Sequence, residues 1–237
     1  MTLTQTIIEH VGLGVPFASV LVGDTTCSGQ RGLLVFPNAL GVSPDTLETA
    51  HEIAAKGYVV LVVDLYGKDV RPTTLVDGSA AAGPLRKDPT RWRTLMNGAL
   101  AVLRAEPSVD PKKLGAIGFC FGGSCALELA RSGADVRAVA SLHGGVATQN
   151  PDDAKSIKGS VFVLHGADDP FVPEADLRAF ESEMRAAGVD WQLIEFGGTV
   201  HSFTDKGANI PGKAVYSPRI VRRAFRMVHD FFDETLA

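Results

Sequence analysis

Residues 114–130 read LGAIGFCFGGSCALELA. An apolar run of strand length leads into glycines around one cysteine, and a helix-like pattern follows. A nucleophile that must stand clear of a sheet needs a sharp turn from strand to helix, where the cramped backbone leaves room for glycine two residues before and two residues after it. Gly118, Cys120 and Gly122 have this spacing, and Gly123 lets the helix pack close to neighbouring strands. The stretch predicts a nucleophile elbow with Cys120 at its apex.

The surroundings of Cys120 favour a reactive sulfur over a structural one. The helix that starts here would direct the positive end of its dipole at Cys120, which favours the thiolate. Taken alone, the spacing also fits a buried structural cysteine. The predicted strand before it and the predicted helix after it are the context that the catalytic motif requires.

Length and composition describe an ordinary globular chain. It has 237 residues, of which 45% are hydrophobic and 21% charged, so one large core is expected and disorder is not. No apolar run approaches the ~20 residues that span a bilayer, so no membrane partner is expected. The net charge of −4 argues against nucleic acid as a partner.

The three cysteines form an odd set without a disulfide framework, and no histidine cluster accompanies them. We therefore expect a reducing, cytoplasmic compartment and no metal. No G-x-G-x-x-G pattern follows a predicted strand, so no organic cofactor is expected either. Cys27 fits an incidental loop thiol, and Cys125 fits the core. His143 and His165 each end a predicted strand, and each fits either a hydrogen-bond donor beside the site or a structural histidine.

Apolar strands alternate with amphipathic helices along most of the chain. This order predicts a mostly parallel sheet with helices on both faces, preceded by an antiparallel edge. We find no internal repeat or linker, so residues 1–237 are predicted to form a single domain. The predicted strands cover residues 6–10, 17–22, 31–36, 58–64, 114–119, 136–142, 160–165 and 191–196, and the predicted helices cover 44–56, 92–105, 122–132, 174–187 and 217–235.

Residues 65–91 interrupt this alternation. They carry glycine, proline and charged residues with weak periodicity. The segment is longer than ordinary connections between elements, so we expect an irregular excursion that acts as a lid or a pocket wall.

Two loops downstream supply partners for Cys120. The loop GADDPFVP, residues 166–173, follows one predicted strand and carries Asp169, while GGTVHSF, residues 197–203, follows the next and carries His201. Loops at the carboxyl ends of parallel strands share one edge of the sheet, where open α/β folds place their sites. His201 would exchange a proton with Cys120, and Asp169 would orient the imidazole.

An oxyanion formed at this site would need two N–H donors. The backbone N–H of Phe121, directly after the nucleophile, is the first candidate, and that of Ala39 in the loop PNALG is the second. Four further residues are interpreted as substrate-pocket candidates, with core packing or a solvated loop as the alternative: Asn38, Leu40, Phe119 and Tyr66.

These motifs resemble the dienelactone hydrolases of the α/β-hydrolase superfamily. The resemblance extends over nearly the whole chain and rests on PNALGV, VVDLYG, GFCFGG, HGADDPFVP and GGTVHSF. It implies the α/β-hydrolase fold with an eight-stranded, mostly parallel sheet. It also implies a Cys–Asp–His triad of Cys120, Asp169 and His201, with Asp169 preferred over Asp168.

Two positions depart from the family pattern. In members that cleave dienelactone, a glutamate stands at the position of Asn38, and an arginine that holds the substrate carboxylate lies four residues after the catalytic histidine. Here that second position is Asp205, which would repel an anionic substrate. Asn38 can form hydrogen bonds but cannot act as a base, so activation of Cys120 would fall to His201 alone.

The sequence therefore predicts a cysteine-dependent hydrolase of neutral activated esters or lactones, with phosphotriesters as an extension. Its partner would be a small neutral ester, and the chain would be a monomer or a homodimer. Two alternatives stay open: hydrolysis of dienelactone (carboxymethylenebutenolide) itself, and a non-catalytic binding protein with a hydrolase-like fold.

Overall fold

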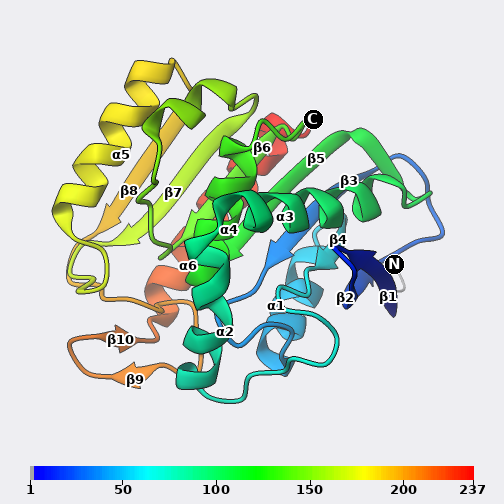
Figure 1. Ribbon diagram of the computed structural model, residues 1–237, viewed down its shortest axis with the longest axis horizontal. Coiled ribbons are helices and arrows are strands. Elements are labelled where there is room, and N and C mark those ends of the chain that lie inside the picture. The colour runs from blue at the N-terminus through cyan, green and yellow to red at the C-terminus, as the bar shows by residue number, and fades with distance from the viewer. Residues whose placement is uncertain (1–2) are drawn as a thin grey trace. The chain divides into compact units, whose positions relative to one another are not determined.

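The computed structural model describes residues 3–237, which form an α/β fold (Figure 1). Its large sheet has eight strands, as predicted, in the order β1-β2-β4-β3-β5-β6-β7-β8. The pairs β3–β4, β6–β7 and β7–β8 are parallel, so the sheet is mostly parallel beyond its antiparallel edge. The strands of this sheet are β1 (Thr4–Gly12), β2 (Val15–Gly23), β3 (Gln30–Phe36), β4 (Tyr58–Val62), β5 (Val109–Phe119), β6 (Ala138–Leu142), β7 (Ser160–Gly166) and β8 (Trp191–Phe196).

Helices cover both faces of these strands, as the alternation predicts. Figure 1 shows α3 in front of β3 and α1 behind the strands near it, and likewise α4 in front of β6 and α6 behind it. The helices are α1 (Pro44–Ala54), α2 (Leu75–Lys87), α3 (Pro89–Arg104), α4 (Phe121–Arg131), α5 (Glu174–Ala187) and α6 (Pro218–Thr235).

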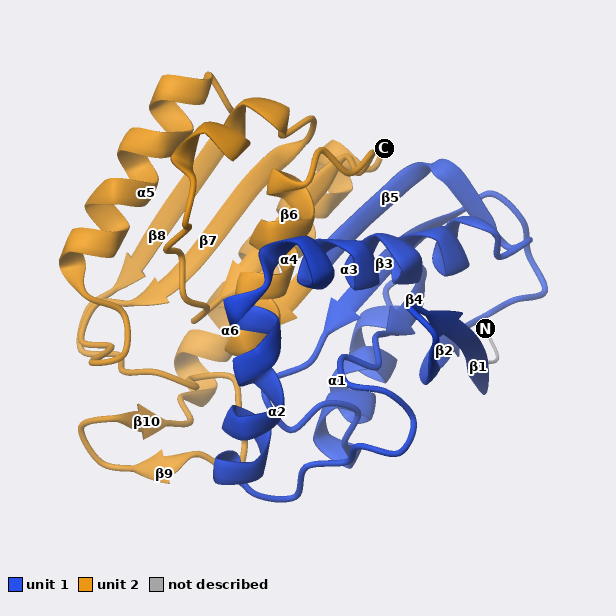
Figure 2. Cartoon of the chain, in the orientation of Figure 1, with its two compact units in different colours: residues 1–116 blue, residues 117–237 orange. Residues whose placement is uncertain are grey.

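The chain divides into two compact units, residues 1–116 and residues 117–237 (Figure 2). The boundary falls within β5, three residues before Cys120 begins the turn into α4. Cys120, Asp169 and His201 all belong to the second unit. That residues 1–237 form a single domain stays a prediction.

The first unit begins with the predicted antiparallel edge. β1 pairs with β2 over its whole length, and the hairpin turns at Leu13 and Gly14, both of which have positive φ values. β2 also pairs with β4, so its second half is buried while β1 is largely exposed. The exposure of β1 follows from its position as the outermost strand.

The segment 65–91 differs from the expected irregular excursion, because α2 and the first turn of α3 lie within it. The Thr74 side chain accepts a hydrogen bond from the Asp77 N–H and caps α2. The buried positions of α2 are Gly78, Ala82 and Leu85, which have helical spacing. Because two of the three are small, they give a weak apolar periodicity, and the sequence alone does not indicate the helix.

The second unit contains the parallel strands β6, β7 and β8 and their helices. The predicted strand over 136–142 begins two residues later, at Ala138. Three short elements without a hydrophobic pattern were not predicted: the 3₁₀-helix η1 (Pro151–Ser156) and the paired strands β9 (Asn209–Ile210) and β10 (Ala214–Val215). Within residues 3–237, no helix has the length and apolarity needed to cross a membrane.

A buried ion cluster fixes the far end of α4. The Arg131 guanidinium donates two hydrogen bonds to the Glu183 carboxylate of α5, at 2.8 and 2.7 Å, and one to Glu128 at 3.0 Å. It also donates to the Val146 carbonyl at 2.8 Å, in the loop after β6. Buried charges require such complete pairing because each one has lost its hydration. The cluster ties α4 to α5 and to that loop.

The close approach of β5 to α4 gives the first testable prediction. A Cβ atom at Gly118 would lie 1.8 Å from the Gly122 carbonyl oxygen, so Gly118→Ala should lower the free energy of unfolding by several kcal/mol or prevent folding. Gly98→Ala is the control, because Gly98 is an exposed residue of α3 with open space around it, and this change should stabilise by ~0.5–1 kcal/mol. Urea unfolding measures both. A Gly118→Ala protein as stable as the wild type would contradict the proposed packing of the turn.

Candidate active site

The turn between β5 and α4 places Cys120 in a conformation that residues with side chains rarely adopt. β5 ends at Phe119 and α4 begins at Phe121, and Cys120 between them has φ 54° and ψ −117°. Such backbone strain is found where a nucleophile is held above a sheet. Gly123 lets α4 pack close to β6, as the sequence predicts, because a Cβ atom there would lie 2.6 Å from the Ser141 hydroxyl of β6.

The loops after β7 and β8 bring the other two predicted side chains to this turn. β7 and β8 run parallel, so their carboxyl ends lie at the same edge of the sheet. His201 Nε2 lies 3.1 Å from Cys120 Sγ, and His201 Nδ1 lies 2.6 Å from Asp169 Oδ2. The structure thus brings together Cys120, Asp169 and His201. The neighbouring Asp168 is exposed.

The burial of the partners strengthens these contacts. The Asp169 side chain is fully buried, and the His201 side chain is 12% exposed. The second carboxylate oxygen of Asp169 accepts a hydrogen bond from the Phe171 N–H at 2.8 Å, which fixes the orientation of the carboxylate. Electrostatic attraction is stronger in such a site than in water because the local dielectric constant is lower.

The protonation of His201 follows from these neighbours. Burial lowers its pKa, but the hydrogen bonds to Asp169 and Cys120 and the charges of both groups raise it, and the result is about 9. His201 is therefore an imidazolium at neutral pH. This places a positive charge 3.1 Å from Cys120 Sγ.

A second histidine, His143, lies directly beside His201, but its pKa is lowered where that of His201 is raised. Burial and the charge of His201 hold the pKa of His143 well below 6.5, so its ring is neutral. The two ring centroids are 5.2 Å apart. His143 Nδ1 accepts a hydrogen bond from the Cys120 N–H at 3.1 Å, and Nε2 lies 2.7 Å from the Thr204 hydroxyl oxygen.

Sequence reasoning left the roles of three residues here unassigned. His143 had two open interpretations, Phe171 lay unassigned inside the motif HGADDPFVP, and Thr204 carried no sequence signal. The Phe171 ring lies 5.2 Å from the His201 ring in an edge-to-face arrangement and is 59% exposed. A large exposed aromatic beside a reactive imidazole is a surface that a ligand can cover.

The predicted oxyanion donor Phe121 is the first residue of α4, directly after Cys120. The predicted pocket residue Phe119 is buried, and its ring stacks on Phe225 of α6 at 6.2 Å. That contact gives Phe119 a packing role, and its contribution to a pocket stays a prediction.

The second predicted donor and the other pocket candidates belong to the first unit. The Ala39 carbonyl accepts a hydrogen bond from the Tyr66 hydroxyl at 3.0 Å, and the Asn38 side chain accepts one from the Leu40 N–H at 3.0 Å. These two bonds hold both ends of the peptide group between Ala39 and Leu40. A Cβ atom at Gly78 of α2 would lie 2.5 Å from the same carbonyl oxygen. Roles of these residues toward a substrate stay predictions.

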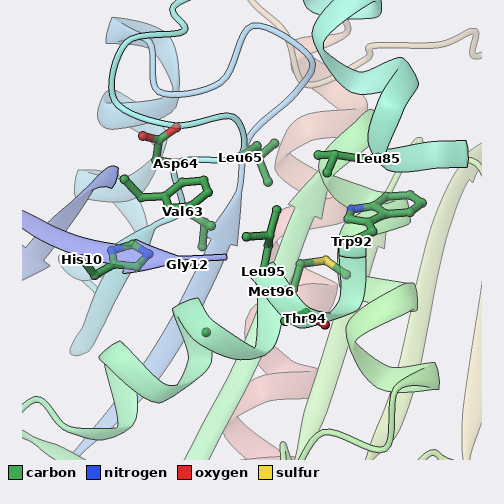
Figure 3. Close-up of a pocket in the computed structure, with 12 residues that line it drawn as sticks. His10, Gly12, Val63, Asp64, Leu65, Leu85, Trp92, Thr94, Leu95 and Met96 are labelled. Carbon is green, nitrogen blue, oxygen red and sulfur yellow. The ribbon is translucent and has the colours of Figure 1, made fainter. Parts of the chain in front are cut away.

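The pocket in Figure 3 also belongs to the first unit. It has a volume of about 30 Å³, and its walls are largely apolar side chains such as Leu65, Leu85 and Trp92. A neighbouring cavity of about 210 Å³ shares Leu65 and Leu85 with it. None of the three triad candidates lines either cavity.

Comparison with known proteins identifies the family of the chain. A sequence model of the dienelactone hydrolase family matches residues 17–236. The chain belongs to the dienelactone hydrolase family. It is therefore a hydrolase of ester or lactone bonds with the fold of this family.

Two solved structures resemble the chain over nearly its whole length. One, named m3DLH, is 36% identical and covers 99% of both chains with a TM-score of 0.94. The other is described as a dienelactone hydrolase-like promiscuous phosphotriesterase from metagenomic libraries. It is 34% identical and covers 98% of both chains with a TM-score of 0.93.

Two curated relatives either match a shorter part of the chain or match it at lower identity than these two structures. An uncharacterised protein of Caenorhabditis elegans is 38% identical over 151 residues, which is 60% of this chain and 92% of the relative. A carboxymethylenebutenolidase homologue of Mus musculus is 22% identical over 206 residues, which is 84% of this chain and 82% of the relative.

The charge of His201 gives the second prediction. In Cys120→Ala the pKa of His201 should fall below the value of about 9, because the hydrogen bond and the charge of Cys120 are lost while burial continues to lower it. The imidazole signals in an NMR pH titration measure the midpoint. In the wild type, the stabilisation from protonated His201 is complete below pH 6.5 and is lost as the pH rises through 9.

Cys27→Ser is the matched control for this titration, because Cys27 is an exposed thiol in the first unit. It should leave the His201 midpoint unchanged. An equal midpoint in Cys120→Ala and the wild type would mean that sulfur and imidazole do not interact.

Proposed function

We propose that the chain hydrolyses neutral, activated carboxylic esters and lactones through a covalent intermediate on Cys120. The observation that carries the proposal is the continuous line of contacts from Asp169 through His201 to Cys120, at 2.6 and 3.1 Å. A buried carboxylate, a protonated imidazole and a thiol in this order can store a nucleophilic thiolate and deliver a proton.

In the acylation half of the reaction, the thiolate of Cys120 attacks the carbonyl carbon of the ester. A carbon–sulfur bond forms, and the carbonyl electron pair moves onto oxygen. The Phe121 N–H at the start of α4 would donate to this oxyanion, with the Ala39 N–H as the predicted second donor. When the intermediate collapses, the carbon–oxygen bond to the leaving group breaks. His201 Nε2–H gives its proton to the departing alkoxide, which leaves as the alcohol.

In the deacylation half, His201 is neutral and acts as a base. It takes a proton from a water molecule while the water oxygen attacks the thioester carbon. Collapse of this second intermediate breaks the carbon–sulfur bond and releases the carboxylic acid. The proton stays on His201 beside the restored thiolate, so the net reaction consumes one ester and one water. In a lactone, the alcohol and the acid stay joined in one product.

The substrate is proposed to be neutral because of the charge around His201. Asp205 follows four residues later, and its carboxylate accepts a hydrogen bond from the Gly207 N–H at 2.9 Å. At this position the members of the family that cleave dienelactone have an arginine that holds the substrate carboxylate, and here a carboxylate takes its place. This favours neutral esters over an anionic dienelactone, which is the alternative substrate of the family.

Phosphotriesters are a second candidate class, supported by the relative described as a promiscuous phosphotriesterase. The same thiolate would attack phosphorus, expel an aryloxide and leave a phosphorylated sulfur that water then releases. A phosphoryl oxygen would occupy the place of the oxyanion.

A substrate panel on purified protein tests these proposals. It contains a neutral aryl ester, a neutral lactone, an aryl phosphotriester and an anionic ester, each assayed with the wild type, Cys120→Ser and Cys120→Ala. Cys120→Ser should lose about a hundredfold or more in kcat, because a neutral hydroxyl replaces a thiolate and needs a general base. Cys120→Ala should lose at least about a thousandfold.

The controls separate the alternatives. Cys27→Ser should keep full activity, since this thiol is exposed and lies in the first unit. Faster turnover of the anionic ester than of its neutral analogue would favour dienelactone hydrolysis. A wild type that turns over no member of the panel, and whose Cys120 resists iodoacetamide at pH 6, would instead be a binding protein with a hydrolase-like fold.

The exposed Phe171 ring generates a prediction about the leaving group. Because His201 protonates the leaving alcohol and Phe171 lies 5.2 Å from His201, the aromatic part of an aryl leaving group should pack on this ring. Phe171→Ala should lower kcat/KM for phenyl acetate by about tenfold, from lost aromatic contact and burial. It should change kcat/KM for ethyl acetate much less.

Phe171→Leu is the matched variant, since it keeps apolar surface without the ring. It should retain part of the preference for the aryl ester. If Phe171→Ala lowered kcat/KM for both esters equally, the ring would serve to shield His201, and the leaving-group contact would be refuted.

A further inference from the structure

His143 occupies a position that the proposed reaction does not use directly. It follows β6 immediately, is 1% exposed, and has a positive φ of 41°. Its ring is surrounded by groups of the candidate site: the Cys120 N–H, the Thr204 hydroxyl, and the rings of His201 and Phe203. Both ring nitrogens of His143 thus have partners that belong to the candidate site.

The hydrogen bonds determine which nitrogen of His143 carries the proton. The Cys120 N–H donates to Nδ1, so Nδ1 is unprotonated. A neutral imidazole then carries its proton on Nε2, and this N–H donates to the Thr204 hydroxyl oxygen at 2.7 Å. His201 and His165 are the titratable groups whose charges lower the pKa of His143, in addition to burial. Protonation of Nδ1 would break the bond to Cys120.

The two partners of His143 belong to different parts of the candidate site. Cys120 is the apex of the elbow, and its N–H also donates to the Leu142 carbonyl at 3.0 Å. Thr204 lies three residues after His201 in the loop that carries this histidine. One neutral imidazole thus connects the backbone of the nucleophile with the loop of the base.

We propose that His143 and Thr204 are positioning residues that hold His201 and Cys120 at reacting distance. The inference rests on the proposed function, because it concerns the same sulfur–imidazole pair. His143 would act in two ways. Its hydrogen bonds fix the elbow relative to the histidine loop, and its uncharged ring lies 5.2 Å from the His201 ring without repelling the imidazolium. Small displacements of reacting groups are costly, since a shift of ~1 Å can lower a rate about a hundredfold.

Four variants test the connection. Thr204→Val removes the acceptor for the His143 Nε2–H while keeping the shape, and Thr204→Ser restores a hydroxyl. His143→Asn keeps an oxygen near the position of Nδ1 for the Cys120 N–H but cannot reach Thr204, and asparagine tolerates the positive φ. His165→Gln is the matched control, because His165 is also buried at the end of a neighbouring strand.

The readout is the rate of Cys120 alkylation by iodoacetamide between pH 5 and pH 9, measured beside kcat, KM and thermal unfolding. Thr204→Val and His143→Asn should each lower the alkylation rate at pH 6 and kcat by about tenfold, with KM nearly unchanged. Thr204→Ser should recover most of both rates. The double variant should lose no more than either single variant, because both changes break the same connection.

His165→Gln should lower stability and leave the alkylation profile unchanged. The inference is overturned if Thr204→Val and His143→Asn alkylate with the wild-type pH dependence. It is also overturned if His165→Gln, at a similar loss of thermal stability, loses as much alkylation rate as they do. Alkylation needs no substrate. A wild type that alkylates rapidly at pH 6 but hydrolyses no ester would therefore refute the proposed function without refuting the positioning role.

Discussion

The absence of a side chain at Gly118 is the constraint on which the rest of the candidate site depends. A Cβ atom there would lie 1.8 Å from the Gly122 carbonyl oxygen, so β5 and the first turn of α4 can approach as they do only with glycine. The chain must then reverse direction within Cys120, which takes φ 54° as a result. That backbone conformation lifts the sulfur to the start of α4. His201 from the loop after β8 and the neutral ring of His143 both contact this one residue, and Asp169 from the loop after β7 contacts His201.

The two adjacent histidines illustrate how surroundings decide protonation. Both rings are largely buried, and burial lowers the pKa of each. His201 has a buried carboxylate on one nitrogen and a sulfur on the other, and these partners raise its pKa to about 9. His143 has a backbone N–H and a hydroxyl as partners, and neither compensates for a positive charge. One imidazole can therefore hold a proton for the reaction while its neighbour remains neutral.

The sequence predicted best those elements that combine an apolar periodicity with capping residues or glycines at their ends. α1 begins where the Ser43 side chain accepts from the Thr46 N–H, and Gly57 follows its end with a φ of 89°. α2 has a cap of its own at Thr74, but its buried face consists largely of small residues, so helical spacing produced no apolar periodicity and the helix was not predicted. β9 and β10 are two residues each and depend on pairing with one another, which no local pattern reveals.

By itself, the sequence determined the elbow, the eight strands of the large sheet with five of its helices, and the identities of Cys120, Asp169 and His201 as the residues to be brought together. It could do so because glycine spacing and apolar periodicity are local properties of the sequence. In addition, the carboxyl ends of parallel strands lie at one edge of a sheet, so the loops that follow them come together. Only the tertiary structure decided what surrounds those residues. The bond from Cys120 to His143, the link to Thr204 and the Phe171 ring beside His201 join residues from separate loops. Their contacts depend on side-chain placement in three dimensions, which spacing along a chain does not encode.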